Sequence, residues 1–166
     1  MEIRQLVADD ASEYLTNRLI ALQENPEAFG SSYEEEKNDS IEKYINRFKL
    51  SLDSFTFGAF EQSELIGTIS LVKETKLKLK HRANIVAVYV KPENRGKGLG
   101  NALLLKAIEK AKTINEIEQL YLTVSAKNSA AKKVYKSMGF EICGTEERSL
   151  KYKDTYYDAD HMVLFL

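Results

Sequence analysis

The chain has 166 residues, of which 43% are hydrophobic and 30% charged, and its formal net charge at pH 7 is −1. These values are typical of a globular protein with one core, so we expect a single domain over residues 1–166. The near-neutral charge argues against a nucleic-acid partner or binding to an anionic membrane surface.

The N-terminal segment has the pattern of a strand over Ile3–Val7, without the basic and then apolar pattern of a secretory signal. No apolar run approaches the length of a membrane span. Cys143 is the only cysteine, which excludes an internal disulfide and suits a reducing compartment, so we expect a cytoplasmic protein with no membrane partner. The histidines and the cysteine form no zinc-binding spacing, so no metal is expected.

Helices and strands are expected to alternate from here on. Asp9 or Asp10 can cap a helix that runs to about Gln23. An aromatic loop, Phe29–Tyr33, separates it from a second helix that Asp39-Ser40 can cap. Three strands follow, at residues 55–61, 64–72 and 83–90. The polar turn Gln62-Ser63 predicts that the first two form a hairpin.

The second half of the chain predicts a βαβ-type unit. A helix after Gly100 and a helix after Asn128 flank a short strand, Leu120–Val124. A strand is then expected to begin at Phe140–Cys143, and a final strand is expected at His161–Leu166. The expected buried side chains of the two helices are Leu103, Leu104, Ala107, Ile108 and Ala111 in the first, and Ala131, Val134, Tyr135 and Met138 in the second. The pattern predicts an α/β fold whose mixed, mostly antiparallel sheet has about six or seven strands, flanked by about four helices.

A glycine-rich segment with the sequence KPENRGKGLG, residues 91–100, follows the strand that ends at Val90. Its glycines allow a tight turn and let a ligand approach the backbone closely. The helix that begins there offers unpaired N–H groups and the positive end of its dipole. With Arg95 and Lys97, the segment predicts a site for a phosphate or pyrophosphate.

Two common phosphate loops do not fit this spacing. A P-loop requires a glycine at the position of Lys91 and a serine or threonine at the position of Gly98. A dinucleotide fingerprint requires G-x-G-x-x-G, whereas the glycines here alternate and are followed by Asn101.

The pattern Arg-x-x-Gly-x-Gly, formed by Arg95, Gly98 and Gly100, resembles the acyl-CoA pyrophosphate loop of the GNAT superfamily of N-acetyltransferases. A second segment agrees, because Asn128 starts a helix that carries Tyr135 and closes on Gly-Phe, as in the family's other signature. Loop and helix follow in the family's order with a strand between them. The resemblance is clear over residues 84–142 and implies one GNAT-like domain.

The resemblance implies that an amine attacks the thioester carbonyl of acetyl-CoA directly, with both substrates bound. In the family, the strand before the glycine loop bulges and splays from the next strand, which here are Ile85–Val90 and Leu120–Val124. A backbone N–H near Tyr89 or Val90 would polarise the acetyl carbonyl. The residues implied in binding the acetyl-CoA co-substrate are Tyr89, Val90, Arg95, Gly96, Lys97, Gly98, Leu99, Gly100, Asn128 and Ala131.

Tyr135 matches the family tyrosine that protonates the leaving thiolate, and it is the catalytic residue that the resemblance implies. Its place on an apolar helix face also fits a core tyrosine. The general base stays open, because the strand at residues 83–90 has no Asp or Glu, where many family members have a carboxylate. The alternatives are a water relayed through backbone groups, Glu34–Glu36, Asp158 and His161.

The expected acceptor is a small-molecule amine. Aromatic residues of the segment Pro26–Tyr33 and of the C-terminal part can wall its pocket, and the tyrosines concerned are Tyr152, Tyr156 and Tyr157. The basic stretch from Lys73 to Arg82 fits an exposed hairpin better than a binding site. Two alternatives remain: an acetyltransferase for a protein N-terminus or lysine, and a CoA-binding module without turnover. The resemblance also leaves a homodimer open, since dimers are common in the family.

Overall fold

Seven strands form one mixed sheet in the order β1-β2-β3-β4-β5-β7-β6. The computed structural model describes all of residues 1–166. The strands are β1 (Glu2–Gln5), β2 (Ser54–Glu61), β3 (Glu64–Lys73), β4 (Arg82–Val90), β5 (Gln119–Ser125), β6 (Glu141–Tyr152) and β7 (Thr155–Phe165). The α-helices are α1 (Ala11–Glu24), α2 (Tyr33–Glu36), α3 (Ile41–Leu50), α4 (Leu99–Lys112) and α5 (Ser129–Ser137). The predicted fold class is confirmed.

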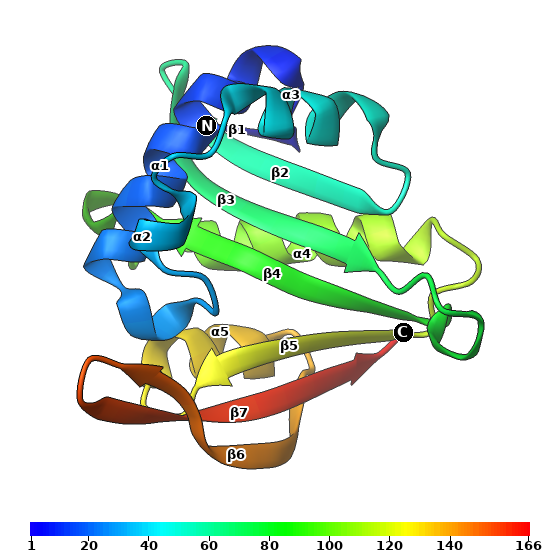
Figure 1. The fold of residues 1–166 in the computed structure, drawn as a ribbon. Coiled ribbons are helices and arrows are strands. Elements are labelled where there is room, and N and C mark those ends of the chain that lie inside the picture. The colour runs from blue at the N-terminus through cyan, green and yellow to red at the C-terminus, as the bar shows by residue number, and fades with distance from the viewer.

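Helices cover both faces of the sheet (Figure 1): α1, α2 and α3 lie on one face, and α4 and α5 lie on the other. The larger core, of 20 buried residues, lies mainly between the sheet and α4. It contains all the α4 side chains that were predicted to be buried. A smaller core of 6 buried residues, which includes Tyr14 and Tyr44, joins α1 and α3 to the sheet. No helix in the structure combines the length and the apolar character needed to cross a bilayer.

Only one pair of neighbouring strands is parallel. β4 and β5 run in the same direction and are connected through α4, as the predicted βαβ unit requires, whereas every other neighbouring pair is antiparallel. This connection places the glycine-rich segment, which joins β4 to α4, at one end of the parallel pair.

Local sequence signals explain where several elements begin and end. Gln62 and Ser63 both have positive φ, 48° and 69°, as a tight two-residue hairpin turn between β2 and β3 requires. Ser40 caps α3 by accepting a hydrogen bond from Glu42 N at 3.2 Å. Gly139, with a φ of 91°, follows α5 and ends it.

The structure corrects three expectations. β7 begins at Thr155, six residues before the predicted His161. β6 begins as expected and continues to Tyr152, an end that its exposed residues, with no alternation of apolar and polar side chains, do not mark. One helical turn, α2, follows the aromatic loop, where Ser32 and Glu35 form a capping box. Asp10 precedes α1 but does not cap it, since its carboxylate accepts a hydrogen bond from Val7 N at 2.7 Å and pairs with Arg4.

Candidate active site

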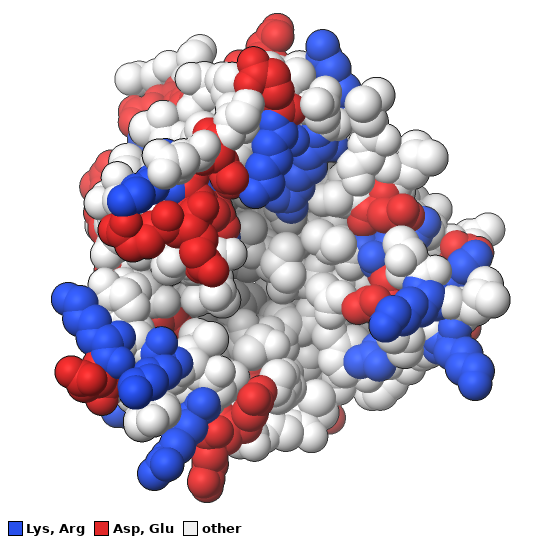
Figure 2. All heavy atoms as spheres, viewed as in Figure 1, with Lys and Arg blue, Asp and Glu red and all other residues white.

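The sheet splits into two halves between β4 and β5. These strands pair only over Arg82–Asn84 and Gln119–Tyr121, whereas β5 stays paired with β7 as far as Ser125. A cleft of about 1020 Å³ occupies the space where they diverge. Figure 2 shows the hollow at the centre of the face that carries α2 and α3. We call the end of this cleft where β4 and β5 still pair its joined end.

A β-bulge interrupts β4 beside the cleft. Tyr89 pairs with Thr68 and Val86 pairs with Ser70, so Ala87 and Val88 together face Ile69 on β3. Ala87 has a positive φ of 53°, a conformation that non-glycine residues seldom adopt. A bulge of this kind leaves backbone groups without a ladder partner. The expected bulge and splay of this strand are therefore present.

The glycine-rich segment, which follows the C-terminal end of β4, presents a row of free N–H groups. Gly96 and Gly98 have φ of 75° and 79°, which favours glycine at both positions. Arg95 Nε donates to the carbonyl of Val90 at 2.9 Å and ties the segment to the strand. The six consecutive backbone N–H groups from Gly96 to Asn101 have no acceptor within the protein. Such a row at a helix N-terminus suits the oxygens of a phosphate or pyrophosphate.

The start of α5 borders the same cleft. Asn128 Oδ1 accepts a hydrogen bond from Ala131 N at 3.0 Å and caps the helix, while its Nδ2 donates to no protein group. A side chain added at Gly100 would contact Val134 Cγ1 at 3.9 Å, so α5 lies close to the first turn of α4. The two helix starts thus flank the opening between the strands.

Tyr135 combines a buried ring with a free hydroxyl. Only 7% of the residue is exposed, yet it lines the cleft, and its hydroxyl has no hydrogen-bond partner in the protein. Burial raises the pKa of Tyr135 to about 12. The phenol therefore stays protonated at neutral pH, as a proton donor must.

The cleft brings together most of the residues that the sequence implied. Those lining it are Tyr89, Val90, Arg95, Gly96, Gly100, Asn128, Ala131 and Tyr135. Lys97, Gly98 and Leu99 are not among its lining residues. The side chain of Leu99 is packed in the main core, so only its backbone N–H remains as a candidate, whereas the side chain of Lys97 is exposed and keeps its charge beside the segment.

The candidate bases differ in position. Glu35 completes the capping box, and Glu34 pairs with Lys37 outside the cleft. Glu36 lines the cleft, but Arg18 donates two hydrogen bonds to it, at 2.8 and 2.9 Å, and lowers the pKa of its carboxyl. That carboxylate is a poor proton acceptor.

Asp158 and His161 also line the cleft, from β7. Asp158 Oδ1 accepts the N–H of Arg148 at 2.8 Å. The ring of His161 lies between Thr123 Oγ1, 3.1 Å from Nδ1, and Glu146 Oε2, 3.2 Å from Nε2. Of the candidate bases, His161 both lines the cleft and has its two ring nitrogens next to a hydroxyl and a carboxylate.

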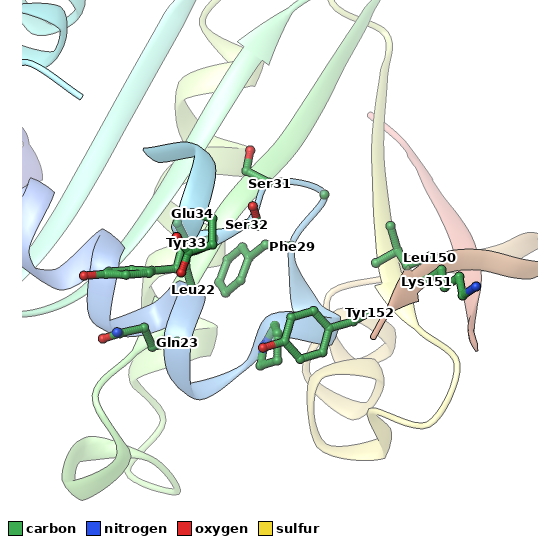
Figure 3. Close-up of a pocket in the computed structure, with 12 residues that line it drawn as sticks. Leu22, Gln23, Phe29, Ser31, Ser32, Tyr33, Glu34, Leu150, Lys151 and Tyr152 are labelled. Atoms are coloured by element: carbon green, nitrogen blue, oxygen red, sulfur yellow. The ribbon is translucent and has the colours of Figure 1, made fainter. Parts of the chain in front are cut away.

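A smaller cavity adjoins the cleft. It has a volume of about 380 Å³ and lies between the loop after α1 and the β6–β7 hairpin. Figure 3 shows Phe29 and Tyr33 on its loop side and Tyr152 on its hairpin side. Phe29 and Leu150 line both spaces. The predicted aromatic wall is thus partly present, whereas Tyr156 and Tyr157 line neither space.

Sequence reasoning missed three arginines that line the cleft, Arg18 on α1, Arg47 on α3 and Arg82 on β4. Arg82 was assigned to an exposed basic hairpin, but it lies on the same strand face as Asn84 and Val86. That period of two along β4 was the available signal. No group of three or more histidine, cysteine, aspartate or glutamate side chains is placed to hold a metal ion.

Known proteins share both the sequence pattern and the fold. Residues 3–162 match the family model described as an acetyltransferase (GNAT) domain. The spermidine N(1)-acetyltransferase of Thermoplasma acidophilum is 31% identical over 156 residues, which cover 88% of this chain and 91% of that protein. The protein of the same name from Vibrio cholerae is 27% identical over 103 residues, covering 62% of this chain but only 58% of that protein.

Among solved structures, YncA of Salmonella typhimurium, determined with its cofactor acetyl-CoA, has a TM-score of 0.88. The comparison covers 100% of this chain and 94% of that chain at 19% sequence identity. At this identity the likeness concerns the fold alone.

Proposed function

This chain belongs to the GNAT family of acetyltransferases, and we propose that it transfers the acetyl group of acetyl-CoA to the primary amine of a small molecule. The amine attacks directly, with both substrates bound in the cleft. The observation that carries this proposal is the row of six free N–H groups from Gly96 to Asn101 beside the split between β4 and β5.

We assign the glycine-rich segment to the pyrophosphate of acetyl-CoA. The N–H groups of residues 96–101 and the positive end of α4 provide a compact site for an anion. Arg95 and Lys97 add positive charge beside it. The free Nδ2 of Asn128 and the small side chain of Ala131 border the space for the pantetheine arm.

Acetyl-CoA, when bound, supplies the thioester whose acetyl group is transferred. Backbone N–H groups at Tyr89 or Val90, next to the bulge, polarise the acetyl carbonyl and stabilise the developing oxyanion. A donor in such a position commonly contributes about 3 kcal/mol to the transition state. The hydroxyl of Tyr135 donates the proton that the leaving thiolate requires.

Removing the proton from the substrate ammonium falls to His161 or to a water in the cleft. His161 is supported by its place among the residues that line the cleft and by its contacts with Thr123 and Glu146. Glu36 is excluded from this role by its ion pair with Arg18.

The small-molecule acceptor is supported by relatives named as spermidine acetyltransferases, at low identity. An acetyltransferase for protein N-termini or lysines, and a CoA-binding module without turnover, are the competing functions. Both competing functions would use the glycine-rich segment in the same way, so only an assay of the acceptor distinguishes them from the proposed function.

A thermal shift experiment tests the cofactor first. At about 100 times Kd, acetyl-CoA should add about 2.7 kcal/mol of stability, which raises Tm by about 5–11 °C in a domain of this size. Gly98→Val should abolish the shift, because a side chain at this positive φ distorts the turn, whereas Gly144→Ala, in open space at ordinary φ, should keep it. An equal shift with ATP or NAD would overturn the proposal.

Thiol release with small amines and with peptides then identifies the acceptor. Turnover with small amines supports the proposed function. Turnover with peptides alone would favour the protein acetyltransferase, and binding without any turnover would favour the CoA-binding module.

A further inference from the structure

Some of the cationic side chains that line the cleft have no carboxylate partner. The cationic side chains that line it away from the glycine-rich segment are Arg18, Lys43, Arg47 and Arg82. Arg18 pairs with Glu36 at 2.8 Å, and Lys43 pairs with Asp39 at 2.6 Å. Arg47 and Arg82 have no carboxylate within 4.0 Å. Figure 2 shows basic side chains gathered below α3 at the rim of the hollow, with acidic side chains over α2.

Arg47 reaches the cleft from α3 and is half-buried. Its Nε donates to Ser54 Oγ at 3.3 Å, the only hydrogen bond of its guanidinium group. The two terminal nitrogens therefore have no acceptor in the protein, although the side chain is held in place.

Arg82 reaches the cleft from the first residue of β4 and is also half-buried. Its guanidinium carbon lies 3.9 Å from the centre of the Tyr121 ring. Stacking fixes the plane of the guanidinium and leaves its edge, with its N–H donors, free. Glu74, which approaches this region, accepts a hydrogen bond from Asn84 Nδ2 at 2.9 Å and forms no ion pair with Arg82.

Strand register places both arginines at the joined end of the cleft. Ser54, Val72 and Asn84 are consecutive partners across β2, β3 and β4. Arg47 contacts the first residue of this row, and Arg82 lies two residues from the last one, on the same face of its strand. The glycine-rich segment follows the opposite end of β4, so these cations are separate from the site assigned to the pyrophosphate.

Arg47 and Arg82 are held in place by Ser54 and Tyr121 and keep N–H donors that no carboxylate of the protein occupies, so an anionic ligand can bind them. Guanidinium groups bind a carboxylate with paired hydrogen bonds of matching geometry. A polyamine, which carries only positive charge, would instead meet like charges at this end of the cleft.

We propose that the acceptor is a small amino acid whose amine is separated from its carboxylate by several bonds, and whose carboxylate is bound by Arg47 and Arg82 at the joined end of the cleft. Its amine then reaches along the cleft toward Tyr89 and Val90, where the acetyl group is transferred. This inference rests on the proposed function and narrows its substrate class.

Steady-state acetylation of matched pairs tests the inference. Each amino acid is assayed beside its decarboxylated amine and beside its amide, with spermidine as the polyamine. We expect kcat/KM to be about tenfold or more higher for the acid than for either analogue, as the loss of charge-assisted hydrogen bonds implies. Arg47→Gln and Arg82→Gln should each raise KM for the acid about tenfold and leave kcat and the rate with the amine unchanged.

The exposed Lys78, which is not among the residues lining the cleft, provides the control variant Lys78→Gln, for which no change is expected. The thermal shift with acetyl-CoA should be the same in all variants, which shows that they fold and bind the cofactor.

Preference for spermidine or for the decarboxylated amines would overturn this inference alone. The inference would also be overturned if Arg47→Gln and Arg82→Gln slowed acetylation of the acid and of the amine equally. An absent acetyl-CoA shift in the unmodified protein would overturn the proposed function, and this inference with it. Binding of acetyl-CoA without acetylation of any amine in the panel would overturn both substrate assignments.

Discussion

The ring of Tyr135 packs against the ring of Phe140, with centroids 6.2 Å apart and planes at 60°. Phe140 is fully buried, so this contact anchors the tyrosine in the main core. The hydroxyl of Tyr135 is nevertheless left without a protein partner at the cleft. An anchored ring with a free hydroxyl is a suitable arrangement for a proton donor, because the ring orientation is fixed before the substrates bind.

Tyr135→Phe should therefore lower kcat by about 10²- to 10⁴-fold. Stability should change little, because the packing against Phe140 remains. The loss should shrink with an acetyl thioester whose thiol has a lower pKa, since its thiolate leaves without protonation. Tyr156→Phe, at the exposed hairpin, is the matched control. Equal turnover of wild type and Tyr135→Phe would remove the assigned role.

Two roles of Asn128 can be tested separately, the cap that it gives α5 and the proposed binding of acetyl-CoA. Its Oδ1 caps α5, while its Nδ2 is free to donate to the pantetheine arm. Asn128→Ala should cost about 1 kcal/mol in the free energy of unfolding and should weaken acetyl-CoA binding. Asn128→Ser keeps a capping oxygen, so it should retain stability while KM for acetyl-CoA rises by about 2- to 12-fold. Urea unfolding and initial rates measure the two effects, and a serine variant with unchanged KM would contradict the binding role.

The ion pair between Arg18 and Glu36 connects α1 to α2 at the rim of the cleft. Both side chains are 13% exposed, and Arg18 also lies over the Phe29 ring at 4.9 Å. Arg18→Met or Glu36→Leu alone should lower stability by about 3 kcal/mol, because each leaves a largely buried charge unpaired. The double variant should recover most of this loss. Lys37→Met, which breaks an exposed pair, is the control and should have little effect. Additive losses in the double variant would argue against this coupling.

Stability should fall in acid. The pKa of Asp10 is lowered by its hydrogen bonds with Arg4, that of Glu36 by Arg18, and that of Asp160 by Lys132 and Thr145. A carboxyl with a lower pKa in the folded state adds stability above its unfolded pKa, and this stability is lost as the pH falls through its folded pKa.

We therefore expect Tm to be nearly constant between about pH 6 and 8 and to decrease below about pH 4. Thermal unfolding across this range measures the effect, and Asp10→Asn should make the decrease shallower. A decrease that begins between pH 6 and 8 would point to another titrating group.

The features that the sequence predicted best are those that depend on local backbone conformation. The alternating glycines after Val90, the helix that Asn128 caps and the turn at Gln62-Ser63 are local features, since φ and capping depend on neighbouring residues. The fold class, the βαβ unit and the buried side of α4 follow from periodicity in the same way. The lengths of β6 and β7 did not, because an exposed strand lacks the alternation that marks a half-buried one.

The sequence by itself determined that this chain has a glycine-rich turn before one helix and a tyrosine on a later helix, because both features are formed by contiguous residues. Only the tertiary structure decided which charges share the cleft. Arg18 and Glu36 neutralise each other across 18 positions, while Arg47 and Arg82, from a helix and a strand far apart in the chain, are left without partners. Pairing of charges depends on distances between elements, and no periodicity along the chain records those distances.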